Sequence, residues 1–247
     1  MLARLFVLAH PDDEVFCTPF LLEGGYQNYV VYLTSGKLPN QPSKIEEIRQ
    51  REAKKSLELI HSHVSTQQII LKNASQDSAL GREITDCLIQ ELIELITNLH
   101  IAECFTMKFE GGHQDHDIAN VITRLLCMKK QVLFREFVMY SPSGWKFINY
   151  KIDMDSATGE VFKFNKLKVV LLALRMMKIY SSQWRTWIGL MLPLVYCFLC
   201  STWRDGYANP RDPFSISKVA LYEIRGKETN QQVNESIQNL IKMFENL

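Results

Sequence analysis

Short apolar runs alternate with longer segments of helical periodicity through the first 140 residues of the chain. Each short run is rich in branched and aromatic side chains, which is typical of buried strands. The predicted strands are Leu2–Leu8, Tyr29–Leu33, Gln68–Leu71, Ala102–Met107 and Val132–Tyr140. Between them, apolar residues recur every three or four positions, as in helices that cover one face of a sheet. The predicted helices are Val15–Leu22, Ser43–Leu59, Gly81–Leu99 and Asp117–Met128.

This alternation predicts an α/β fold, a Rossmann-like three-layer sandwich in which helices cover both faces of a mostly parallel sheet. Ser43 and Glu46 have the spacing of a capping box and predict where the second helix begins. No internal repeat or low-complexity linker interrupts the chain, so residues 1–247 are predicted to form one domain. Its core is expected at 1–140, and a C-terminal hairpin and helix extension at 141–247.

The extension has a different pattern from the core. Lys146–Lys151 and Glu160–Phe164 flank a turn-like Asp-Ser-Ala-Thr-Gly sequence and predict a hairpin. Leu167–Tyr180 is predicted to be a helix, and Lys218–Ile224 a strand that returns to the same domain.

Thr186–Trp203 is a run of 18 residues without a charge, bounded by Arg185 and Arg204. Its length is that of a minimal membrane span. However, Pro193 interrupts it, and the sequence on both sides is that of one soluble domain. We therefore expect a pair of helices that packs on the domain near its ligand pocket, with at most one face exposed. That face is compatible with a hydrophobic part of a ligand or with peripheral contact at a membrane surface.

The composition is that of an ordinary globular protein, with 47% hydrophobic and 22% charged residues and a net charge of +1. This charge argues against a nucleic-acid partner. The six cysteines are scattered in apolar contexts, and the CxxC spacing of Cys197 and Cys200 has no second pair, so we interpret them as reduced core residues. Because the sequence opens directly with a predicted strand, we expect no signal peptide. A cytoplasmic, possibly membrane-peripheral location is expected, and no pattern specifies an oligomeric state.

Candidate chemistry begins where the first strand ends, at His10, Asp12 and Asp13. Ligands of open α/β folds bind at the carboxyl ends of the strands. Pro11 sets a turn there, so these side chains project from a loop held by a rigid strand. Imidazole with a carboxylate suits zinc, and a second, adjacent carboxylate suits a general base.

A second cluster follows the fourth predicted strand, where His113 and His116 flank Gln114 and Asp115. A helix that begins near Asp115 would bring the two histidines onto one face. Each histidine alone is more often a surface or core residue, but two clusters at two strand ends together indicate a site. A dinucleotide site is not indicated, because no G-x-G-x-x-G follows the first strand.

The sequence AHPDDE at 9–14, followed much later by HQDH at 113–116, resembles the PIG-L/LmbE family of zinc-dependent N-acetylglucosaminyl deacetylases. The resemblance implies that His10, Asp13 and His116 hold the metal and that Asp12 is the general base. It implies that His113 stabilises the oxyanion or protonates the leaving amine, and that Asp115 orients His113. Zinc is the expected cofactor, although a two-histidine, one-carboxylate set also suits Fe2+.

Three further segments carry the resemblance. Thr34-Ser35-Gly36 matches the family's Thr-x-Gly loop. Arg49, Glu52 and Leu59 fit its R-x-x-E…L-G pattern, although Ile60 replaces the glycine. Lys178 and Ser182-Gln183 match a Lys…Ser-Gln segment, so Arg49 and Gln183 are the expected substrate contacts. Gln114 stands where bacterial members have proline, which puts the loop shape in doubt rather than the chemistry.

The resemblance thus predicts a metal-dependent hydrolase that removes the N-acetyl group from an N-acetylglucosamine conjugate, either lipid-linked or a small glycoside. The alternative is a non-catalytic sugar-binding or membrane-associated scaffold that retains the fold. The intact set of histidines and aspartates favours the enzyme, because a scaffold needs none of them.

Overall fold

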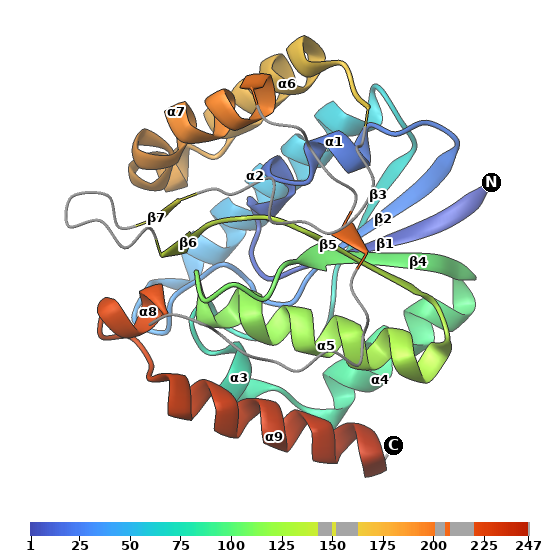
Figure 1. The fold of residues 1–247 in the computed structure, drawn as a ribbon, viewed down its shortest axis with the longest axis vertical. Helices are drawn as coiled ribbons and strands as arrows, with labels where there is room; N and C mark the ends of the chain where they lie inside the picture. The colour runs from blue at the N-terminus through green and yellow to red at the C-terminus, as the bar shows by residue number, and fades with distance from the viewer. Residues whose placement is uncertain (143–149, 152–162, 201–205, 208–219, 247) are drawn as a thin grey trace.

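The computed structural model describes residues 1–142, 150–151, 163–200, 206–207 and 220–246. At its centre is a six-stranded sheet in the order β3-β2-β1-β4-β5-β8 (Figure 1). All strands are parallel except β8, which pairs antiparallel with β5. The strands are β1 (Leu2–Leu8), β2 (Tyr26–Tyr32), β3 (Thr66–Ile69), β4 (Ile101–Met107), β5 (Leu133–Phe137) and β8 (Gly206–Tyr207).

Helices cover both faces of this sheet (Figure 1). One layer contains η1 (Asp13–Val15), α1 (Thr18–Leu21), α2 (Ser43–His61), α6 (Lys166–Ile179), η3 (Ser181–Gln183) and α7 (Trp184–Cys200). The other layer contains α3 (Leu80–Glu83), α4 (Asp86–Asn98), α5 (Gln114–Lys130) and α9 (Asn230–Asn246). The remaining elements are α8 (Leu221–Ile224) and a small antiparallel pair, β6 (Ser141–Pro142) with β7 (Tyr150–Lys151).

The central strands β1 and β4 are buried on both faces, as the apolar run Leu2–Leu8 predicts. Phe6 of β1 stacks on Phe105 of β4 with ring centroids 4.7 Å apart. Arg4 is fully buried in β1, where its guanidinium contacts Glu103 at 2.8 Å and Glu23 at 2.6 Å. This pairing explains how a charge is tolerated in a core strand.

The predicted α/β fold with a mostly parallel sheet is confirmed, but several element boundaries were wrong. The predicted helix Gly81–Leu99 is two helices, because the side chain of Thr85 caps α4 by accepting from the Leu88 amide at 3.3 Å. The capping box is also wrong, since Ser43 is already helical and Pro42 precedes it without a side-chain cap. Both errors concern local capping choices that the periodicity does not encode.

Larger differences lie in the extension. Leu221–Ile224 is helical rather than part of a strand, and Tyr150–Lys151 pairs with Ser141–Pro142. The rest of the predicted hairpin, and 218–219 of the predicted strand, lie outside the described residues, apart from Lys163 and Phe164, which belong to no strand. Helix α9 was not predicted.

Helix α7 runs through Pro193 as one helix, so the predicted interruption is wrong. Its buried residues pack against the domain, which confirms that this part of Thr186–Trp203 lies against the core: Trp187, Leu190, Leu194 and Phe198 are all buried. Packing along the whole inner face offsets the hydrogen bond that proline removes. Among the described residues, no helix has the length and apolarity needed to span a bilayer.

Candidate metal centre and active site

The site lies where the strand order changes direction. From β1 the chain continues to β2 on one side, whereas β4 lies on the other side. The loops after β1 and β4 therefore meet at the carboxyl edge of the sheet, which is the position of ligand sites in open α/β folds. His10–Asp13 comes from the first loop, and His113–His116 comes from the second, at the start of α5.

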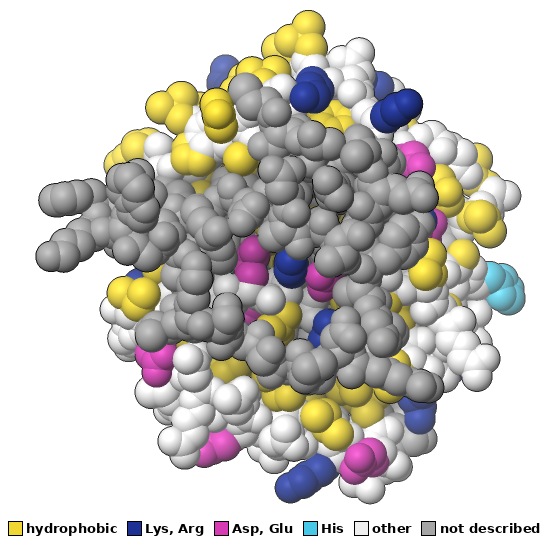
Figure 2. Space-filling model, viewed as in Figure 1, with side chains coloured by type: hydrophobic (Ala, Val, Ile, Leu, Met, Phe, Trp, Pro, Cys, Tyr) yellow, Lys and Arg dark blue, Asp and Glu magenta, His cyan; other side chains and the backbone are white. Residues whose placement is uncertain are grey.

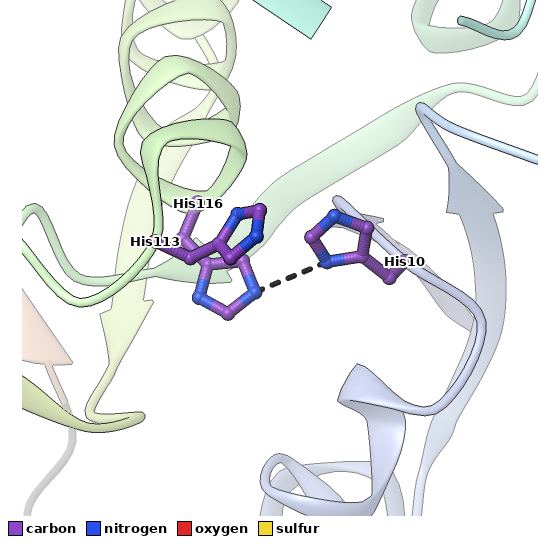
Figure 3. A group of neighbouring side chains, drawn as sticks. All are labelled: His10, His113 and His116. Atoms are coloured by element: carbon purple, nitrogen blue, oxygen red, sulfur yellow. Dashed lines mark hydrogen bonds between the residues drawn. The ribbon is translucent and has the colours of Figure 1, made fainter. Parts of the chain in front are cut away.

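Donor atoms of His10, Asp13 and His116 converge between these loops. His10 Nδ1 lies 3.2 Å from His116 Nε2 (Figure 3). Asp13 Oδ1 lies 3.3 Å from the same His116 atom. Ligands about 2.0–2.1 Å from a tetrahedral zinc ion are roughly 3.3 Å apart. The three residues are at most 6% exposed. The donor set and its spacing thus fit the predicted zinc ligands.

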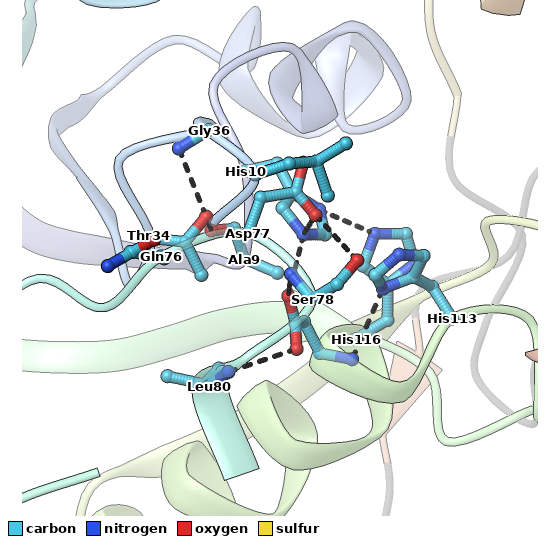
Figure 4. A network of polar contacts seen from close by, with 12 residues as sticks. Ala9, His10, Thr34, Gly36, Gln76, Asp77, Ser78, Leu80, His113 and His116 are labelled. Atoms are coloured by element: carbon cyan, nitrogen blue, oxygen red, sulfur yellow. Dashed lines mark hydrogen bonds and ion pairs between the residues drawn. The ribbon is translucent and has the colours of Figure 1, made fainter. Parts of the chain in front are cut away.

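The opposite nitrogen of His10 faces carboxylates. Its Nε2 lies 3.4 Å from Asp77 Oδ1 (Figure 4). The same nitrogen lies 3.0 Å from Asp115 Oδ2. Burial lowers the pKa of His10, but Asp77, Asp115 and Asp13 outweigh it and raise this pKa well above the ordinary value. A carboxylate behind a ligating histidine fixes the tautomer that presents the other nitrogen to a metal.

The structure differs here from the predicted role of Asp115. We expected its side chain to orient His113, yet its carboxylate faces His10 and also accepts from the amides of Ser78 and Leu80, at 2.6 and 3.2 Å. Only the Asp115 backbone contacts His113, by donating to Nδ1 at 3.2 Å. The first turn of α5 directs the side chain toward β1, which spacing alone did not reveal.

His113 caps the amino end of α5 and lines the pocket. Because its Nδ1 accepts from the Asp115 amide, its neutral ring carries the proton on Nε2. Burial and the neighbouring histidines hold the pKa of His113 well below its ordinary value. The ring is perpendicular to that of His10, with centroids 4.7 Å apart. His113 therefore presents an N–H donor beside the proposed metal ligands.

Asp12 has a strained backbone, with φ of 126°, in a region that non-glycine residues rarely adopt. Two groups hold it there: Arg49 Nη2 donates to the Pro11 carbonyl at 2.5 Å, and Glu14 Oε2 accepts from the Asp12 amide at 3.1 Å. Asp12 Oδ1 lies 3.4 Å from Arg49 Nη2. Burial raises the pKa of Asp12 to about 8, while Arg49 opposes the shift. Such a carboxylate suits a general base near neutral pH.

Glu14 is fully buried beneath this loop. Its carboxylate accepts from Ser56 Oγ at 2.6 Å, from Tyr32 at 2.9 Å and from the Tyr180 hydroxyl. Burial raises its pKa, and the hydroxyls oppose the shift. Glu14 thereby joins the Asp12 loop to α2, to β2 and to the end of α6.

One face of α2 connects the Asp12 loop to the extension. Arg49 and Ser56 contact the loop as described above. Between them, Glu52 accepts from Ser181 Oγ at 3.1 Å and from the Ser182 amide at 2.9 Å, both in η3. Arg49 is only 2% exposed, although it lines the pocket. Arg49 therefore supports the Asp12 loop from below and also faces the pocket.

A pocket of about 300 Å³ opens above the histidines. The extension supplies its outer wall, including the predicted contact Gln183 together with Trp187 and Leu190. Arg225 and Lys227, which follow α8, add positive charge, and Lys227 Nζ lies 3.4 Å from His113 Nε2. In Figure 2, acidic and basic side chains are visible together near the centre of this view.

Sequence reasoning missed several residues of this site. Asp77, Tyr140, Arg225 and Lys227 line the pocket but lie in segments without a motif. Glu14 was also missed, although its place in the AHPDDE sequence was a signal that it belongs to the site. Gly112 was missed as well. Only glycine fits at this position, because a Cβ there would lie 2.0 Å from the Tyr140 carbonyl oxygen.

Comparison with known proteins agrees with the fold and the motifs. Residues 5–127 match the model of the PIG-L family, described as GlcNAc-PI de-N-acetylase, which confirms the predicted resemblance. This stretch contains every proposed metal ligand. None of the curated proteins compared with the chain matches it.

Solved structures of deacetylases share the fold. A deacetylase of teicoplanin biosynthesis is 14% identical, with a TM-score of 0.57 over 82% of this chain and 95% of that one. The pseudoaglycone deacetylase of the antimicrobial reagent A40926 is 13% identical, with a TM-score of 0.55 over 83% and 98%. A zinc-inhibited form of teicoplanin deacetylase is 12% identical, with a TM-score of 0.55 over 78% and 90%. At these identities the likeness establishes the fold alone.

Proposed function

We propose that this protein is a metal-dependent deacetylase that hydrolyses the N-acetyl group of an N-acetylglucosamine conjugate to a free amine and acetate. The observation that carries the proposal is the convergence of His10, Asp13 and His116 beside a strained, partly buried Asp12. The family match over 5–127 supports the same reaction. A sugar-binding scaffold would have no need of the strained backbone at Asp12.

His10 Nδ1, His116 Nε2 and Asp13 would hold zinc, or Fe2+, with Asp115 and Asp77 fixing the His10 tautomer. The bound ion would supply Lewis-acid activation of the amide carbonyl and of the attacking water. Asp12 accepts the proton of this water as general base. The Nε2–H of the neutral His113 ring stabilises the oxyanion, and the proton that Asp12 has accepted passes to the leaving amine.

The substrate is a sugar conjugate whose aglycone contacts the extension. Trp187, Leu190 and Phe16 form an apolar wall suited to a sugar ring or an acyl group, and Arg225 with Lys227 suits an anionic group on the aglycone. Both a glycolipid and a small glycoside meet these requirements. Gln183 and Arg49 are the proposed polar contacts to the sugar.

Acetate release from a panel of soluble and lipid-linked N-acetylglucosaminides tests this proposal. Zinc-loaded and anaerobically iron-loaded protein should both be assayed, with Asp12→Asn as the matched inactive control. We expect release from at least one member, lost in the control. Binding of panel members without acetate release in either metal form would instead establish the scaffold.

A further inference from the structure

Helices α6 and α7 form an antiparallel hairpin over the domain, with Lys166 Nζ donating to the Leu199 carbonyl at 2.9 Å. The inner face of α7 belongs to the pocket and core, since Trp187 and Leu190 are only 6% and 5% exposed. The outer face has none of this packing, although its residues are equally apolar.

Five large side chains recur every three or four residues along the outer face of α7, and we call this set the outer stripe. They are Trp184, Ile188, Leu192, Tyr196 and Leu199, with exposed fractions of 56, 68, 72, 66 and 44%. Leu167 and Leu171 of α6 are similarly exposed, at 63 and 50%. A continuous apolar stripe on a helix marks an interaction surface rather than scattered surface residues.

The charged side chains of the hairpin are all positive. None of the 27 acidic residues lies between 166 and 200, although the whole chain is nearly neutral. Five cations in this segment are all exposed: Lys166, Lys168, Arg175, Lys178 and Arg185. They reach both ends of the outer stripe, because Lys166 contacts Leu199 at one end and the Arg185 guanidinium lies 5.4 Å from the Trp184 ring centroid at the other. Figure 2 shows hydrophobic side chains with Lys and Arg among them along its upper edge, where α6 and α7 lie in Figure 1.

We propose that this hairpin docks the protein on the surface of an anionic phospholipid bilayer. The outer stripe enters the boundary between headgroups and acyl chains, where tryptophan and tyrosine are favoured, and the cations contact the lipid phosphates. A second copy of the chain is a poorer occupant, because a symmetric dimer through this face would bring five cations against five. The inference concerns membrane binding and does not depend on the proposed reaction.

Docking would place the pocket at the membrane, because the two faces of α7 are only one helix diameter apart. Trp187 lines the pocket from the inner face, and Ile188 belongs to the outer stripe. A lipid-linked sugar would therefore reach the pocket without leaving the bilayer surface.

Sedimentation with vesicles tests the proposal on the full chain. Wild-type protein should bind phosphatidylcholine vesicles that contain phosphatidylserine, and Leu192→Asp should reduce binding at least about tenfold. The matched control is Ile70→Asp, because Ile70 is 73% exposed after β3 while Leu192 is 72% exposed. This control should bind as the wild type does. Equal binding of the wild type and Leu192→Asp, or no binding of the wild type, would overturn the proposal.

A second arm tests the charge. Lys168→Glu/Arg175→Glu should weaken binding to the phosphatidylserine vesicles, and so should salt near 1 M, where the Debye length falls to about 3 Å. Retained thermal midpoints would show that the variants fold. If gel filtration instead reveals a dimer that Leu192→Asp dissociates, and the wild type ignores vesicles, the face is a self-association surface and the proposal is wrong. Acetate release from a soluble substrate is scored separately, so failure of docking and failure of the enzymatic proposal are distinguishable.

Discussion

The two walls of the pocket are built in different ways. On the sheet side, His10, Asp12 and Asp13 lie on the loop after β1, and His116 lies in the first turn of α5. Asp115 contacts the His10 ring, Glu14 accepts from the Asp12 amide, and the His10 amide donates to Asp13. On the extension side, α7 and the segment after α8 contribute apolar and cationic side chains. Under the proposed function, this difference assigns the reaction chemistry to the core and the selection of substrate to the extension. Substitutions in the two walls should therefore fail in different ways.

The largest effect is expected from the metal ligands. His10→Ala/His116→Ala should lose nearly all bound metal and reduce acetate release at least about 10³-fold, because two of the three protein ligands are gone. Elemental analysis of protein prepared without chelators measures the metal. His63→Ala, at an exposed histidine, is the control and should retain it. Full metal retention in the double variant would refute the assigned site.

The adjacent aspartates should separate binding from catalysis. Asp13→Asn should lose metal and activity together. Asp12→Asn should keep the metal and lose about 10²–10⁴-fold in kcat, which is the usual contribution of a general base. Measuring the metal-to-protein ratio and kcat on the same preparations checks this division. Equal metal loss in both variants would contradict it.

Glu14→Gln should produce a smaller catalytic loss, of about tenfold in kcat with the metal retained, because the acceptor of the Asp12 amide is weakened. Tyr32→Phe is the control, since it removes one hydroxyl from the Glu14 carboxylate and leaves the contact with Asp12. Both variants should lower the thermal midpoint, but only Glu14→Gln should also alter the pH profile of kcat. Identical profiles in the two would mean that Glu14 acts on stability alone.

The smallest effect should come from the other wall. Trp187→Leu removes aromatic surface from the pocket and should raise KM several-fold, by about 1 kcal/mol, with little change in kcat or metal content. Steady-state kinetics on the best panel substrate provide the measurement. A fall in kcat without a change in KM would show that the extension takes part in the chemistry, and the contrast between the walls would disappear.

The sequence was sufficient for the centre of the fold because β1 and β4 are buried on both faces and are therefore continuously apolar. It also located both site loops, since each follows such a strand. It did not reveal Asp77 or Lys227, which reach the site through long-range folding of loops with ordinary turn composition. Asp115 shows the same limit: its position was predicted, but its partner depends on the direction in which α5 leaves β4.

The polar face of α2 also limits which segments of this protein can be exchanged in a chimera. Arg49, Glu52 and Ser56 lie one turn apart and hold, in order, the Asp12 loop, η3 and Glu14. Exchanging the α6–α7 hairpin to change substrate preference would leave Glu52 without Ser181 and Ser182, and Glu14 without Tyr180. In a functional chimera, the incoming hairpin must therefore carry hydrogen-bonding residues equivalent to Tyr180, Ser181 and Ser182 between its two helices. The boundary of the smallest exchangeable segment is thus set by its hydrogen bonds to α2. This boundary differs from the predicted end of the core at residue 140.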